Sequence, residues 1–90
     1  MDKKEKQRIT VLMKNLDSIG LLFPLMSSFV ADKSESKSEK KESYKIANEF
    51  LECLDDASLN PQRSEAIKYL LDYSIESLKK EISEDNKTEK

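Results

Sequence analysis

The chain of 90 residues contains no histidine and no tryptophan, and only one glycine, one cysteine and two prolines. Without histidine it lacks the commonest general base near neutral pH and the commonest metal ligand. A single glycine allows neither a glycine-rich phosphate loop nor a nucleophile elbow. We therefore expect a non-enzymatic protein with no cofactor, no metal site and no catalytic residue.

The lone cysteine, Cys53, excludes an internal disulfide and gives no support for a thiolate metal site. It falls among apolar positions, so we expect a small buried side chain in a protein of a reducing compartment. No signal peptide is evident, and the longest apolar run is shorter than the roughly 20 residues of a membrane span. We expect a cytoplasmic protein without a transmembrane segment.

The chain has no large excess of one charge sign, because 16 basic and 18 acidic residues are interspersed along it. Such a pattern disfavours non-specific binding to nucleic acid. Helix-forming Lys, Glu and Leu are abundant, while the turn residues of tight hairpins are scarce. The composition predicts an all-α fold, a small antiparallel bundle of three or four helices in a single domain, and it resembles that of microbial accessory proteins.

The clearest helix signal lies in residues 60–83. Asn60 can cap a helix, Pro61 suits its first position, and Ile67 and Leu71 belong to an apolar stripe at helical spacing. The remaining members of the stripe are Leu70, Ser74, Ile75, Leu78 and Ile82. We expect this helix to span 61–83 and the last residues, 84–90, to form a disordered tail.

Two further helical segments are predicted. The first covers residues 3–30, with a break near Pro24 and an apolar stripe formed by Ile9, Leu12, Met13 and Leu16. The second covers residues 43–57 and begins at Ser43 as its cap. Between them, residues 31–43 are rich in Lys, Ser and Glu and lack any apolar anchor, so we expect a linker.

These short helices carry more large apolar side chains than one small monomer can cover. We predict that the protein binds another protein as an adaptor, inhibitor or regulator, and that it forms a homodimer or higher oligomer. The expected contact residues are Leu22, Phe23, Met26, Phe29, Tyr69 and Tyr73. The alternatives are a helix-turn-helix DNA-binding regulator and an immunity-like protein at a membrane surface.

Overall fold

The structure, a computed structural model, describes the backbone of residues 2–31 and 36–88 and the side chains of residues 2–30 and 36–83. This part of the chain is helical and contains no strand. It forms four helices, α1 (Lys3–Ser18), α2 (Leu22–Ala31), α3 (Lys37–Cys53) and α4 (Pro61–Thr88). The prediction of an all-α fold with three or four helices is confirmed.

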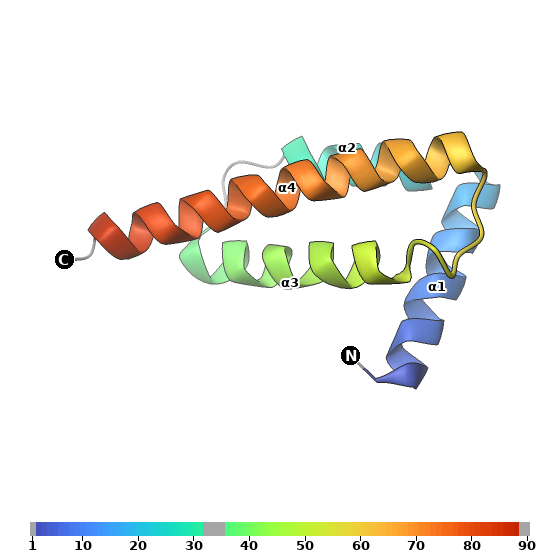
Figure 1. Cartoon of the computed structure of the whole chain (residues 1–90), viewed down its shortest axis with the longest axis horizontal. Coiled ribbons are helices and arrows are strands. Elements are labelled where there is room, and N and C mark those ends of the chain that lie inside the picture. Colours follow the sequence, from blue (N-terminus) through green and yellow to red (C-terminus); the bar gives the residue numbers. More distant parts are fainter. Residues whose placement is uncertain (1, 32–35, 89–90) are drawn as a thin grey trace.

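Each helix packs against two of the other three. α4 lies against both α3 and α2, and α1 lies against the same two helices, so the contacts run in a closed cycle. In Figure 1, α3 and α4 lie side by side and run in opposite directions, while α1 crosses them at one end. An antiparallel arrangement of the whole set stays a prediction.

The first break in the described chain lies at residues 19–21 and α2 starts at Leu22, close to the break expected near Pro24, but the residue that causes it is Gly20. Gly20 adopts a left-handed φ of +75°, its N–H donates to the carbonyl of Asp17 (3.0 Å), and the N–H of Leu21 donates to Leu16 (2.8 Å). These two bonds form a Schellman motif, which ends a helix most readily at glycine. Pro24 is the third residue of α2, where a missing N–H breaks no helical hydrogen bond.

α3 starts at Lys37, six residues before the predicted start at Ser43. The backbone N–H of Glu39 donates to Ser36 Oγ (3.3 Å), and that hydroxyl donates to Glu39 Oε1 (3.0 Å), so the two side chains cap the first turn. Most of the expected linker is therefore helical, and Ser43 is buried within the helix. Residues 32–35 lie outside the described part of the chain.

α3 ends at Cys53 rather than at residue 57, and a turn covers residues 54–58. Ser58 has a left-handed φ of 55° there. α4 begins as predicted, since Asn60 Oδ1 accepts from the N–H of Gln62 (3.0 Å) and Pro61 is the first helical residue. Its backbone continues to Thr88, beyond the expected end at 83, and residues 89–90 lie outside the described part.

All four helices contribute to one small core. α4 supplies Ile67 and Leu71, both fully buried, in agreement with the predicted stripe. The other buried apolar residues are Met13, Leu22, Met26, Ala47, Cys53, Leu54, Ala57 and Leu78. Leu12, which we expected on the buried stripe of α1, is instead 48 % exposed.

Leu71→Ala should lower the free energy of unfolding by about 2–5 kcal/mol, because it leaves a cavity where α4 meets the core. A small domain has only about 5–15 kcal/mol in total, so the loss is readily measured. Urea denaturation followed by circular dichroism is the measurement, with Lys68→Ala on the exposed side of α4 as the control. A midpoint equal to that of the control would contradict the assigned core.

Candidate interaction surfaces

The structure divides the six predicted contact residues into two groups. Leu22 and Met26 are each only 1 % exposed and belong to the core, and Phe29 packs partly buried against it. Leu22 and Met26 are therefore not available to a partner in this fold. The sequence could not separate these residues from their neighbours because the whole run around them is apolar.

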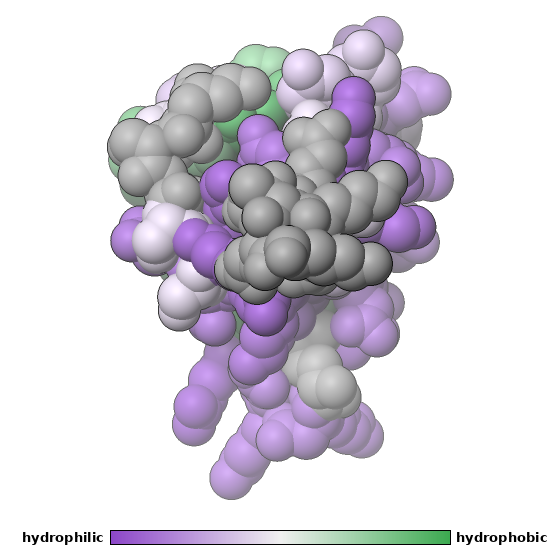
Figure 2. Space-filling model, turned by 90° about the vertical axis from the view of Figure 1, so that its left-hand side faces the viewer, coloured by the Kyte–Doolittle hydropathy of each residue, from purple (hydrophilic) through white to green (hydrophobic). Residues whose placement is uncertain are grey.

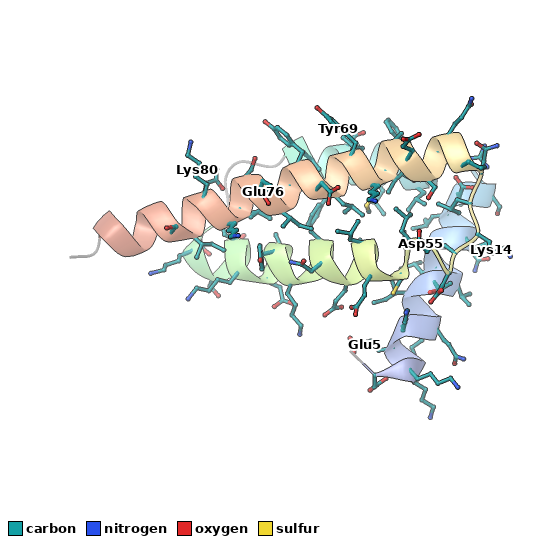
Figure 3. The ribbon with its side chains drawn as sticks, in the orientation of Figure 1. Glu5, Lys14, Asp55, Tyr69, Glu76 and Lys80 are labelled. Carbon is teal, nitrogen blue, oxygen red and sulfur yellow. The ribbon has the colours of Figure 1, made fainter. Side chains whose placement is uncertain are left out.

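The other group, which we call the aromatic set, consists of Phe23, Tyr69 and Tyr73. Their exposed fractions are 44 %, 72 % and 53 %. Tyr69 and Tyr73 are four residues apart and so lie one above the other on the outward side of α4. Figure 3 shows Tyr69 projecting from the side of α4 that is turned away from α3. Phe23 lies on α2, which packs against α4.

Further exposed apolar side chains, which we had not assigned to a contact surface, lie on α1 and around the bend that follows it. Ile19 is 66 % exposed, Leu21 is 51 % exposed and Leu25 is 46 % exposed. No charged residue stands between Asp17 and Asp32 in the sequence. Figure 2 shows apolar atoms gathered at the upper left, where α2 lies, while polar residues cover most of the rest of that face.

The outward side of α1 combines cationic and apolar side chains. A shallow groove of about 510 Å³ runs along it, lined by Lys4, Gln7, Arg8, Val11, Leu12 and Asn15. No acidic residue lines this groove. Neither Lys4 nor Arg8 forms an ion pair with any of the described residues. Val11 and Leu12, with exposed fractions of 57 % and 48 %, supply its apolar part.

Two ion pairs tie the inner side of α1 to the rest of the fold. Arg63 contacts both carboxylate oxygens of Asp17 through Nε and Nη2, each at 3.0 Å. Lys6 Nζ lies 3.1 Å from Asp56 Oδ2. The hydrogen bond and charge of Asp56 raise the pKa of Lys6 above its usual value. The charges of both pairs are neutralised within the fold and are less available to bind a partner.

Cys53 is fully buried where α1 meets α3. Its thiol donates to the carbonyl oxygen of Lys6 at 3.7 Å, and that oxygen also accepts from Thr10 Oγ1 at 2.8 Å. Burial raises the pKa of the Cys53 thiol above its ordinary value of 9.0, because it disfavours the thiolate. A neutral, enclosed thiol is a poor nucleophile and serves here as a packing residue.

A second groove, of about 570 Å³, lies on another side of α1. Lys6 and Asp56 line it together with Lys3, Gln7, Thr10 and Val11.

The residues described by the structure contain no group of three His, Cys, Asp or Glu side chains placed to hold a metal ion. Every buried polar side-chain atom among them has a hydrogen-bond partner.

Within the described residues, no single helix is long and apolar enough to cross a membrane. One pair, Lys3–Ser18 with Leu22–Val30, meets that test when the two helices are taken together, although they are bent by 110° at the break.

No known protein family, curated protein or solved structure matches this chain.

The Cys53 thiol should react at least about 100-fold more slowly with a disulfide reagent at pH 8 than the thiol of Asn15→Cys in a Cys53→Ala background. Asn15 is exposed on α1, whereas Cys53 becomes accessible only when the helices open. Because burial disfavours the thiolate, ionisation of this thiol should not affect the free energy of unfolding below pH 9.0 and should lower it as the pH rises from 9.0 through the higher folded pKa. Equal reaction rates in the folded proteins would contradict the burial.

Proposed function

We propose that this chain is a non-enzymatic helical protein of the cytoplasm that acts by binding another protein, and that it also associates with itself. The observation that carries the proposal is the exposure of large apolar side chains on a domain whose core is already filled. The aromatic set of Phe23, Tyr69 and Tyr73 is the contact surface. In this role the protein is an adaptor, inhibitor or regulator.

Aromatic side chains favour this assignment on energetic grounds. Phe and Tyr bury large areas at low conformational cost, and aromatic residues are enriched at the centres of protein interfaces. A tyrosine hydroxyl can remain at the wet rim of a contact while its ring is buried. Tyr69 and Tyr73 lie opposite the buried Ile67 and Leu71, so a partner can cover them without disturbing the core.

The charges near the start of α4 favour a protein partner over duplex DNA. The first half of the helix offers few cations, and Arg63 is already paired with Asp17. Glu65 and Asp72 stand on the exposed side, together with Lys68. A recognition helix normally presents basic and amide side chains to the groove, so DNA binding has little support here.

Sedimentation equilibrium tests the self-association. The wild-type protein should show a mass that rises from monomer to dimer or higher oligomer as the concentration is increased. Phe23→Ser combined with Tyr73→Ser should weaken association by at least about tenfold, because two aromatic contacts are removed. The control is Leu12→Ser, which removes an equally exposed apolar side chain from α1.

A wild-type protein that stays monomeric up to high micromolar concentration would overturn the self-association. If Leu12→Ser weakened association as much as the double variant, the assignment to the aromatic set would be wrong. Circular dichroism of each variant shows whether the helices are retained.

A further inference from the structure

The outward side of α1 carries a strip of cations and apolar side chains with no acidic residue among them. Because a helix turns by about 100° per residue, Lys4, Arg8, Val11 and Leu12 fall on one side. Asp2 is used as the helix cap, accepting from the N–H of Glu5 (2.8 Å). We call the set Lys4, Arg8, Val11, Leu12 and Asn15 the cationic strip.

The remaining charges of α1 leave the strip positive. Asp17 is held by Arg63 on the inner side of the helix. Glu5 and Lys14 lie on opposite flanks of α1, as Figure 3 shows, and so offset each other. Residues 1–31 contain five basic and three acidic side chains, whereas residues 32–90 contain eleven basic and fifteen acidic ones. The chain thus has a positive end on an otherwise acidic molecule.

Beyond the cationic strip the chain presents uncharged apolar residues. Ile19 and Leu21 are exposed at the bend, and Leu25 follows four residues after Leu21. The N–H of Leu25 donates to the carbonyl of Leu21 (3.0 Å), so Leu21, just before α2, lies on the same flank as Leu25 in its first turn. Phe23, two residues from Leu25, points about 200° away around the helix. The aromatic set therefore does not use this flank.

We infer that the cationic strip and the neighbouring Ile19 bind an anionic lipid surface. Lys4 and Arg8 contact the negatively charged headgroups, and Val11, Leu12 and Ile19 enter the boundary between headgroups and acyl chains. In helices that lie at a membrane surface, cations contact the headgroups and apolar side chains enter the boundary with the acyl chains. Each Lys or Arg near such a surface contributes attraction that salt weakens.

On the cationic strip, charged and apolar side chains lie close together, and this favours a lipid surface over a soluble acidic partner. Lys4, Arg8, Val11 and Leu12 lie within a little over two turns, so the phosphate-binding and apolar contacts follow one another along about 12 Å of helix. Lipid headgroups present charge directly above an apolar layer at that scale. The long side chains of Lys4 and Arg8 can reach headgroup phosphates while their aliphatic stems stay with the apolar residues.

Vesicle co-sedimentation at low salt tests the proposal. The vesicles are phosphatidylcholine alone, or phosphatidylcholine with about one third phosphatidylserine. The variant is Lys4→Gln with Arg8→Gln, and its control is Lys79→Gln with Lys80→Gln, which removes the same charge from the exposed side of α4. Poly-glutamate serves as a soluble acidic probe, and sedimentation equilibrium of the Lys4 and Arg8 variant reports any contact between copies.

The wild-type protein and the control should bind the anionic vesicles, bind neutral vesicles only weakly, and lose binding when salt is added. Replacing Lys4 and Arg8 should weaken binding on the order of 30-fold. Leu12→Ser alone should weaken binding by roughly tenfold relative to the wild type, and a purely electrostatic contact would not show this loss.

Absence of binding to anionic vesicles would overturn the proposal, as would equal binding by the Lys4 and Arg8 variant. Binding to poly-glutamate alone, lost in that variant, would instead identify an acidic protein as the partner. A changed oligomer mass in that variant would identify a second copy. The aromatic-set variant keeps the cationic strip, so it should bind vesicles like the wild type.

Discussion

The packing of α4 on both α2 and α3 is the contact on which the other elements depend. Ile67 and Leu71 are fully buried, Leu78 is nearly so, and these residues bring together two helices that do not pack on each other. α1 then completes the cycle by lying against α2 and α3, where Met13 and Cys53 are buried. Hydrophobic burial of this kind is the main favourable term in folding, and here one helix provides much of it.

A core this small also explains why so much apolar surface remains outside. Four helices around a few buried side chains cannot enclose every large residue, because small domains have a high ratio of surface to volume. The exposed large apolar residues lie on α1, at the bend that follows it, on α2 and on α4. The two proposed contacts, through the aromatic set and the cationic strip, both follow from this arrangement.

Sequence reasoning succeeded where several local signals agreed. In α4, the cap at Asn60, Pro61 and the stripe through Ile67 and Leu71 all indicate the same helix, and the structure has it. It expected a break near Pro24, and the helix does restart at Leu22, but it attributed the break to the proline, whereas the left-handed conformation of Gly20 ends α1. The start of α3 was missed because low-complexity composition concealed the capping pair of Ser36 and Glu39.

The contact residues were predicted only in part, and the reason differs from the one for the helix ends. In the run from Ile19 to Val30 nearly every side chain is apolar, so periodicity cannot say which side turns inward. That choice depends on the bend at Gly20 and on the packing of α2 against α4 and α1, with Leu22 and Met26 buried and Phe23 exposed. Such long-range information is absent from a single sequence.

Native-state amide hydrogen exchange tests the central role of α4 most directly. The account predicts that the slowest amides lie in residues 67–78 of α4 and in the part of α3 that packs on it, and that both exchange with the same free energy of opening. If residues 67–78 exchanged as fast as the end of α4 while α1 stayed protected, the account would be contradicted.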